Sequence, residues 1–412
     1  MGTEFLKIKE VEEGKDIIKK LFNQLYYPKS EEIAIENSYN KVLFNDIKSL
    51  MDLPPFNRSL KDGFALKSEA SFGASEENPK ILKCIDSVEA GSFSDKTIDT
   101  EECIEISTGA PIPDGADAVA MVEFSEKKDN KIFILKSVTP TQDIALKGSD
   151  IKKDKLLLKK GSILSPDKIG VLSAQGIKKV ATFKSPKIAV ISTGNELLKE
   201  NEQMKYGKIY DVNSNTIKNA VISCGGYGVA KGIVKDSYDE LKSMIQESLT
   251  TTDIIICSGG TSAGVGDVLR HVLEDIGEVV IHGISVKPGK PTIIGKVDGK
   301  LIIGLPGNPV SALIIFYVFI APNIRKLAGL NEIEKSKIAT ATLSKRLHSS
   351  KGRMQYSLVK LEKELAIPII KDSGAVTSLA EADGYVKIPK SVELVDEGEE
   401  VEVTLFNDYN LD

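Results

Sequence analysis

The chain carries glycine-rich stretches of the kind that bind anions. Three of them each follow a short apolar run: Ser192–Glu196 (STGNE), Ser258–Asp267 (SGGTSAGVGD) and Gly304–Pro309 (GLPGNP). Glycine lets another group approach the backbone closely, and successive N–H groups at a strand end bind phosphates and other anions. Each stretch alone could be an ordinary tight turn. The three together favour one shared phosphate-binding floor.

A pair of lysines could supply positive charge to the same ligand. Lys287 and Lys290 lie in the sequence KPGKP, where proline and glycine prevent a helix. We expect the turn to point both side chains in a similar direction, and the lysine ammonium suits a phosphate or another oxyanion. A solvated surface turn is the alternative for these lysines considered alone.

Acidic residues recur beside the glycines. Glu196 and Asp267 end two of the glycine-rich stretches, and Asp236 follows an expected strand. Carboxylate oxygens next to bound phosphate are the ligands that Mg²⁺ uses in proteins. Asp236 and Asp267 could equally be helix N-caps.

The cysteines and histidines argue against other chemistries. The three histidines are scattered and show no metal-ligand spacing. We expect the four cysteines, which are far apart and form no CxxC pair, to be buried and reduced: Cys84, Cys103, Cys224 and Cys257. This pattern argues against a zinc site and against hydrolysis by a covalent nucleophile.

Bulk composition describes a multidomain globular protein. A length of 412 residues exceeds what one core usually serves, so we expect three or four domains. The net charge of −5 gives no indication of a basic surface that would bind nucleic acid. The longest apolar run (312–321) is too short to cross a bilayer, and the N-terminus has no apolar signal core. We therefore expect a cytoplasmic protein without a membrane partner.

An α/β domain must position the three glycine-rich loops. From residue 187 onward, expected strands and helices alternate, which predicts a largely parallel sheet with helices on both faces and strand C-termini at one edge. Ser237 and Glu240 fit a capping box for one of these helices, and a long apolar helix should follow Asn308.

Other elements flank this domain. Residues 8–25 should form an amphipathic helix, and a second helix should begin at Pro166 with Ser165 as its cap. Residues 52–145 indicate a small β-domain, in which AVAMVEF and KIFILKSV should form a hairpin around SEKKDN. Short strands after residue 335 indicate a C-terminal β-domain.

Seven motifs in order resemble one known family. The motifs are SLKDGFAL, STGAPIPDGADAVAMVE, STGNEL, GKIYDVNS, SGGTSAGVGD, KPGKP and GLPGNPVSAL, and they resemble those of the MoeA-type molybdopterin molybdenumtransferases, the family of the gephyrin E-domain. The resemblance implies an α/β multidomain protein whose central domain has the flavodoxin-like, MogA-like fold of molybdopterin adenylyltransferases. The implied domains are a composite N-terminal helical and linker domain (1–50 plus 146–183), a small β-rich domain (51–145), an α/β molybdopterin-binding domain (184–332) and a C-terminal β-domain (333–412).

The resemblance also implies a reaction and partners. The family inserts molybdate into adenylylated molybdopterin with Mg²⁺-dependent release of AMP, and it works as a homodimer. A molybdopterin adenylyltransferase and the apo-proteins of molybdoenzymes are the implied partners. The choice between molybdate and tungstate stays open, because the two oxyanions have the same charge and nearly the same size.

Site residues follow from the same resemblance, position by position. The implied catalytic residues are Asp62, Thr108, Asp150, Glu196, Asp236 and Asp267, with Glu196 and Asp267 as Mg²⁺ ligands and Asp62 acting across the dimer interface. The implied substrate-binding residues are Ser258, Gly259, Gly260, Ser262, Lys287, Lys290, Pro306, Pro309, Arg353 and Ser378. Ser373 is the alternative register for Ser378.

The sequence departs from the family pattern at three places. Phe64 stands where the family often has tyrosine, and Asn195 replaces a frequent aspartate. Val265 and Gly266 leave out an acidic residue often found before the position of Asp267. The last two changes remove negative charge near the expected metal.

Two other functions stay open: molybdopterin adenylyltransferase, and a non-catalytic scaffold like the gephyrin E-domain.

Overall fold

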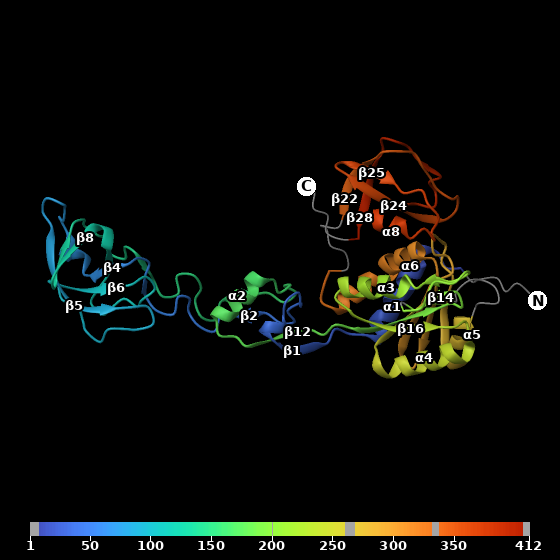
Figure 1. Cartoon of the computed structure of the whole chain (residues 1–412), viewed down its shortest axis with the longest axis horizontal. Coiled ribbons are helices and arrows are strands. Elements are labelled where there is room, and N and C mark those ends of the chain that lie inside the picture. Colours follow the sequence, from blue (N-terminus) through green and yellow to red (C-terminus); the bar gives the residue numbers. More distant parts are fainter. Residues whose placement is uncertain (1–7, 200, 260–267, 332–337, 407–412) are drawn as a thin grey trace, which may run out of the picture. The chain divides into compact units, whose positions relative to one another are not determined.

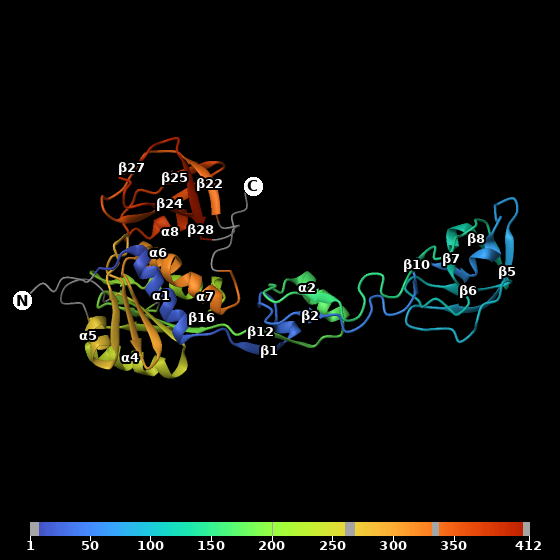
Figure 2. The same cartoon turned by 180° about the vertical axis from the view of Figure 1, so that it is seen from behind.

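The chain divides into two compact units. The computed structural model describes residues 8–199, 201–259, 268–331 and 338–406. The first unit combines the N-terminal segment up to Phe44 with everything from Lys179 onward, and the second unit is Asn45–Lys178. Figure 1 and Figure 2 show these parts from opposite sides. The four-domain division implied by the sequence is finer than these two units and stays a prediction.

A six-stranded mixed sheet forms the centre of the first unit. Its strands, in spatial order, are β16 (Tyr227–Val234), β13 (Lys187–Thr193), β17 (Ile254–Ser258), β21 (Lys300–Leu305), β20 (Ile293–Val297) and β18 (Glu278–His282). The first four run parallel, as predicted, whereas β20 runs antiparallel to both of its neighbours, β21 and β18. The reversal before β21 is a two-residue Asp298–Gly299 turn with positive φ at both residues, the standard connection of a tight hairpin.

Helices cover both faces of this sheet (Figures 1 and 2). One face carries α4 (Tyr238–Thr251) and α5 (Val268–Ile276), whose buried leucines and isoleucines pack on Ala189, Ile191 and Ile255. The other face carries α1 (Val11–Leu25), α3 (Asn213–Ser223), α6 (Pro309–Ile315), the π-helical turn η4 (Phe316–Ile320) and α7 (Ala321–Leu327). Successive strand residues face opposite helical layers, so the buried strands are apolar throughout.

The predicted N-terminal helix is confirmed with a slightly later start. In α1, Ile18 and Phe22 are buried in the core of the α/β sheet, and Ile17, Leu21 and Leu25 pack against it. These are the five residues that the periodicity placed on one face.

The helix after Asn308 is longer than its apolar run suggests. The helical run Pro309–Leu327 has 19 residues and a mean hydropathy of 1.5, enough by length and composition to cross a membrane. However, 78% of its most apolar window is buried within the fold, and Phe316, Phe319 and Ile320 lie in the core. Within the described ranges it is the one helix of this kind, and its burial on the sheet is typical of a core helix.

The C-terminal segment consists mainly of short strands, as predicted. Its strands are β22 (Ile338–Leu343), β24 (Met354–Glu362), β25 (Leu365–Pro368), β26 (Gly384–Ile388) and β28 (Glu400–Leu405), with the short helix α8 (Thr377–Glu381) between β25 and β26. β26 pairs with both β28 and β24, which closes the five strands into a ring. Short β19 (Val286–Lys287) adds to β24 in parallel and joins this domain to the α/β domain.

Short pairs complete the first unit. They are β1 (Ser30–Ala34) with β12 (Lys179–Phe183), β14 (Leu197–Leu198) with β15 (Ile209–Tyr210), β23 (Leu347–His348) with β27 (Leu394–Val395), and the turn η1 (Ile35–Asn37).

A second six-stranded sheet forms the core of the unit of residues 45–178. Its strands, in spatial order, are β7 (Ala118–Met121), β4 (Gly63–Leu66), β6 (Glu102–Ile106), β5 (Lys80–Val88), β9 (Lys131–Ile134) and β8 (Ser125–Lys128). The remaining elements are β2 (Ile47–Lys48), β3 (Arg58–Ser59), β10 (Ile144–Ala145), β11 (Leu156–Leu158), α2 (Pro166–Ala174), η2 (Ser68–Ser71) and η3 (Val122–Phe124). Both faces of the sheet are buried, by Leu82 and Ile132 on one side and Ile104 and Val119 on the other.

The predicted hairpin in this unit was wrong in its first strand. Ser125–Lys128 is itself a strand, β8, and pairs with β9 across a two-residue turn at Asp129 and Asn130. Asp129 has a positive φ, which short polar residues tolerate. The run AVAM instead pairs with β4. Because the turn takes only two residues, all four residues of SEKK pair with β9, and SEKK is a strand rather than a loop.

Two predicted helix caps form without their side-chain hydrogen bonds. Helix α4 starts after Ser237 as expected, but the Ser237 side chain does not cap it. Asp239 and Glu240 place negative charge in its first turn, which stabilises a helix N-terminus without a cap. Helix α2 starts at Pro166 as expected, and the Ser165 hydroxyl bonds to the Asp167 carboxylate rather than to the backbone.

Candidate functional site

Three glycine-rich loops leave the α/β sheet at the same edge. Strands β13, β17 and β21 are parallel neighbours, and their last residues are in register: Ser192 opposite Ser258, and Ser258 opposite Leu305. The loops that follow these strands therefore start side by side, as the sequence predicted. The Gly259 N–H donates to the Leu305 carbonyl (3.2 Å) and links two of them.

The KPGKP turn reaches this edge because β20 is antiparallel. Ile293, at the start of β20, lies opposite Gly304 near the end of β21. The KPGKP turn, which precedes β20, therefore lies at the C-terminal edge of the parallel strands. The Lys290 carbonyl accepts hydrogen bonds from the N–H groups of Ile284 (3.0 Å) and Thr292 (2.9 Å), which anchor the turn.

Buried polar side chains lie beneath these loops. The Asn213 amide donates to the Ser258 hydroxyl (2.8 Å) and to the Gly307 carbonyl (2.6 Å), so one side chain ties two loops together. Ser258 is 2% exposed, and its hydroxyl lies 3.4 Å from the Pro306 carbonyl. Ser258 therefore supports the loops from below. Asn213 lies in the motif GKIYDVNS, which supported the family resemblance, but it was not among the predicted site residues.

A pocket of about 1000 Å³ opens above the loops. Its wall includes these residues from the predicted site: Glu196, Asp236, Gly259, Lys287, Lys290, Pro306, Arg353 and Ser378. The α/β domain supplies the first six, and the C-terminal domain supplies Arg353 and Ser378. Pro309 is not in the lining and instead occupies the first turn of α6. Gly260, Ser262 and Asp267 lie outside the described residues.

Carboxylates occupy one part of the wall. The Asp236 carboxylate accepts from the Asn195 N–H, and the Asn195 side-chain carbonyl accepts from the Asp236 N–H, each at 3.3 Å. Asparagine at position 195 thus pairs with Asp236 without adding a second negative charge. The Glu196 carboxylate folds back on Gly194, where a Cβ atom would lie 2.7 Å from both of its oxygens.

Cations occupy another part of the wall. The β19–β24 pairing sets Val286 opposite Met354 and Lys287 opposite Gln355, and both Lys287 and Arg353 line the pocket. The Lys287 ammonium donates to the Ser350 hydroxyl (2.7 Å). Within the described part of the chain, the Lys290 ammonium makes no hydrogen bond or ion pair. Its charge is therefore available to a ligand.

Hydroxyl groups complete the pocket. Ser378 is 2% exposed and Thr193 is 4% exposed, and neither hydroxyl has a hydrogen-bond partner among the described residues. Ser373, the alternative register for Ser378, also lines the pocket, and its hydroxyl accepts from the Asn308 amide (2.9 Å). Both serines therefore face the same cavity, and Ser378 keeps an unused hydrogen-bonding group.

Sequence reasoning missed three basic residues of the wall. Arg346, His348 and Lys371 come from the C-terminal domain. Arg346 is paired with Asp396 (2.8 Å) and Lys371 with Glu381 (2.6 Å). None of them lies in a motif with regular spacing, so only the closure of the domain onto the α/β sheet reveals them.

Three predicted residues belong to the other unit. The Thr108 N–H donates to the Asp62 carboxylate (2.6 Å), across the ends of the paired strands β4 and β6. Asp150 is exposed, its N–H donates to the Leu53 carbonyl (3.0 Å), and it makes no hydrogen bond or ion pair with Asp62 or Thr108. Phe64, the residue without the family's hydroxyl, is buried in the core of this unit.

The Asp62 carboxyl is expected to titrate below the ordinary value of 3.8. The Thr108 N–H lowers the Asp62 pKa most, and the Thr108 hydroxyl lowers it further. Because the folded pKa is depressed, this contact stabilises the fold above pH 3.8 and the stabilisation is lost as the pH falls through the folded pKa. Thr108→Ala removes the hydroxyl but keeps the N–H, so the Asp62 pKa should move part of the way back up.

Carboxyl titration by NMR measures this effect directly. Asp86, in the same unit, has a pKa lowered by the Ser94 hydroxyl and the Ser87 N–H. It should not respond to Thr108→Ala and serves as the internal control. An Asp62 pKa that is ordinary in the unmodified chain would contradict the structure.

Family models match nearly the whole chain. Residues 9–176 match the MoeA N-terminal region (domain I and II), residues 189–326 match the "Probable molybdopterin binding domain", and residues 340–406 match the MoeA C-terminal region (domain IV). A molybdopterin molybdenumtransferase from Staphylococcus aureus (strain COL) is 35% identical over 384 residues, which cover 91% of each chain.

Solved structures agree with these matches. A molybdopterin biosynthesis MoeA protein from Pyrococcus horikoshii superposes with a TM-score of 0.85 at 41% identity, covering 98% of this chain and 100% of that one. A second MoeA structure from that organism gives a TM-score of 0.75 at 30% identity, covering 97% and 100%. The predicted multidomain α/β fold class is confirmed.

Proposed function

The chain belongs to the MoeA family of molybdopterin molybdenumtransferases, and we propose that it inserts molybdate or tungstate into adenylylated molybdopterin with Mg²⁺-dependent release of AMP. It is a transferase of molybdenum cofactor biosynthesis. One observation carries the finer proposal: a single pocket presents Lys287, Lys290 and Arg353 together with Glu196 and Asp236. A substrate with a pyrophosphate and an oxyanion needs both kinds of charge.

The donor chemistry of the pocket fits Mg²⁺. This ion is usually held by one or two carboxylates, with phosphate oxygens and water completing its shell. Glu196 and Asp236 offer such oxygens on one wall, although the described residues include no cluster of three or more acidic, histidine or cysteine ligands. Asp267, the other ligand that the sequence suggests, lies outside them. When bound, the ion neutralises negative charge on the pyrophosphate.

The side chains of the protein bind and orient the reactants. Lys287, Lys290 and Arg353 hold the oxyanion beside the dithiolene, and the unpaired Ser378 hydroxyl can donate to one of its oxygens. Pro306 and Pro309 shape the turn that carries the loop N–H groups. The negative charge that develops as AMP leaves is stabilised by these fixed cations and N–H groups, and most of the rate comes from that positioning.

Assembly belongs to the same proposal. The active form is a cytoplasmic homodimer, in which Asp62 acts across the dimer interface. A molybdopterin adenylyltransferase supplies the substrate, and molybdoenzyme apo-proteins accept the product. Sedimentation of the full chain tests the dimer, and a monomer at micromolar concentration would contradict it.

AMP formation tests the reaction. Purified chain is incubated with adenylylated molybdopterin, and AMP is separated by chromatography. We expect rapid AMP release only when Mg²⁺ and an oxyanion are both present, because the oxyanion takes part in cleavage. Comparing molybdate with tungstate then identifies the preferred oxyanion.

Two controls separate the other functions. Release of pyrophosphate from ATP with unmodified molybdopterin would identify an adenylyltransferase. Absence of AMP under all conditions, with the fold intact by circular dichroism, would favour a scaffold.

A further inference from the structure

Two cysteines that are distant in sequence lie next to each other in the unit of residues 45–178. Cys84 in β5 and Cys103 in β6 are directly opposite in a parallel pairing. Paired strands lie about 4.8 Å apart, and a disulfide needs Cα atoms roughly 4.4–6.8 Å apart. The side chains of Cys103 and Cys84 are also hydrogen-bonded to each other. The two sulfurs therefore lie on the same side of the sheet, within reach of a bond.

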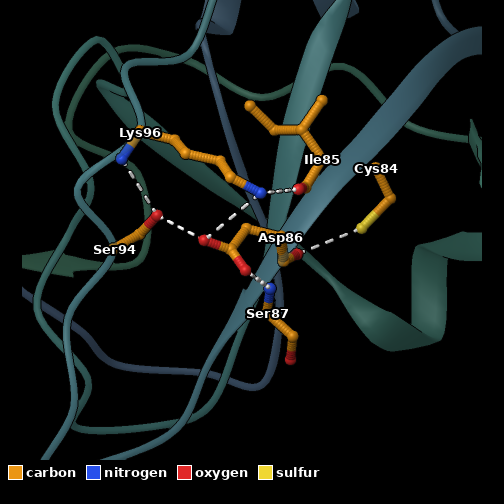
Figure 3. Close-up of polar contacts among 6 residues, drawn as sticks. All are labelled: Cys84, Ile85, Asp86, Ser87, Ser94 and Lys96. Carbon is orange, nitrogen blue, oxygen red and sulfur yellow. Dashed lines mark hydrogen bonds and ion pairs between the residues drawn. The ribbon is translucent and has the colours of Figure 1, made fainter.

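The two thiols differ in their access to solvent. Cys103 is fully buried, whereas Cys84 is half-buried. Figure 3 shows the Cys84 thiol directed at the backbone of Asp86, whose carbonyl accepts its hydrogen bond at 3.3 Å. The strand is irregular here, because its register to β6 shifts between Cys84 and Asp86. Such an irregularity leaves a residue unpaired and disrupts the ladder locally.

Polar contacts hold this irregular stretch in place. The Asp86 carboxylate accepts from the Ser94 hydroxyl (2.6 Å) and the Ser87 N–H (3.0 Å) (Figure 3). The Lys96 ammonium donates to the Ile85 carbonyl (2.5 Å). Cys84 is thus the reachable member of the pair, next to an irregularity in the ladder, with Cys103 beside it on the neighbouring strand.

We propose that Cys84 and Cys103 form a reversible redox site, which a small disulfide such as oxidised glutathione converts to an intrachain disulfide between β5 and β6. The inference does not depend on the proposed reaction. Cys224 and Cys257 are both buried in the α/β domain. They take no part.

The exchange balances in two steps. The Cys84 thiolate attacks one sulfur of oxidised glutathione, the glutathione S–S bond breaks, and one glutathione thiolate leaves with a proton from the solvent. Cys103 then loses its proton and attacks the Cys84 sulfur, which releases the second glutathione. The protein loses two electrons and two protons, and one oxidised glutathione becomes two reduced molecules.

The second step should be the slower one. Burial raises the Cys103 pKa, and the neighbouring Glu105 and Glu102 raise it further. The thiolate is the reacting form, so ring closure should speed up as the pH rises. The Lys127 ammonium, which interacts electrostatically with both thiols and hydrogen-bonds Glu105 (2.5 Å), is the facing cation.

Peptide mapping of the full chain tests the proposal. The protein is incubated with oxidised glutathione, free thiols are alkylated under denaturing conditions, and peptides are analysed by mass spectrometry. We expect one cross-linked pair joining the Cys84 and Cys103 peptides, lighter by two hydrogens than the reduced pair, with Cys224 and Cys257 fully alkylated. Dithiothreitol should restore all four thiols.

Single variants report the order of the steps. Cys103→Ala should leave Cys84 as a stable mixed disulfide with glutathione, whereas Cys84→Ser should leave Cys103 unmodified. In the unmodified chain, a persistent mixed disulfide at Cys84, a cross-link between two molecules, or four unreacted thiols at equilibrium with oxidised glutathione would each overturn the proposal.

Discussion

Replacing Lys290 with methionine should slow AMP release by roughly 10²–10³-fold, a loss of about 2.7–4 kcal/mol of transition-state stabilisation. Lys290 lines the pocket, and its ammonium pairs with no group in the described part of the chain. Its positive charge is thus available to a bound anion. Methionine keeps most of the length of the side chain, and the turn is held by the Lys290 carbonyl, which the substitution preserves.

Steady-state kinetics and thermal unfolding together test this role. The rate of AMP release is measured against molybdate concentration, and the melting temperature is measured for the same preparations. Lys351→Met is the matched control: Lys351 is exposed, lies outside the pocket lining and pairs with Glu393 at 3.0 Å. Surface pairs of this kind contribute little, so its rate should stay within about twofold of the unmodified chain. Equal losses in the two variants would refute the role of Lys290.

Much of this site could be predicted from the sequence, because each of its loops is a run of consecutive residues. STGNE, SGGTSAGVGD and GLPGNP each end a strand, and parallel strands bring their ends to one edge. The lysines of KPGKP were also recognisable as a rigid pair. Their delivery to that edge, however, depends on the antiparallel run of β20, and this reversal rests on the Asp298–Gly299 turn. The sequence predicted strands there but not their direction.

Contacts between distant segments could not be predicted in the same way. The pairing of β19 with β24 sets Lys287 opposite Gln355 and brings the C-terminal domain to the pocket, and no local sequence pattern predicts it. Arg346 and Lys371 line the pocket from the same domain. The adjacency of Cys84 and Cys103 likewise depends on register between strands separated by a long loop, and cysteine spacing alone suggested two unrelated buried thiols.

The packing of the loops predicts a large structural effect at Gly259. This residue has a φ of +98°, and a Cβ atom there would lie 2.2 Å from the Thr193 carbonyl oxygen and 2.9 Å from its hydroxyl. Neither the backbone nor the buried Thr193 side chain can move freely, because both loops leave adjacent strands. We expect Gly259→Ala to lower the free energy of unfolding by about 3 kcal/mol, combining backbone strain with the clash. The Gly259 N–H bond to Leu305 should weaken as the loops separate, so AMP release should fall as well.

Gly299→Ala separates the two causes of this loss. Gly299 also has a positive φ, of +73°, but a Cβ atom there meets nothing within 4 Å. The control therefore carries the backbone strain alone, which costs about 1–2 kcal/mol, and it should leave AMP release unchanged because the hairpin lies outside the pocket lining. Denaturant unfolding of both variants gives the difference. If the two alanines destabilise the fold equally, Gly259 does not pack closely against Thr193 in solution. The loops after β13 and β17 would then be arranged differently beneath the pocket.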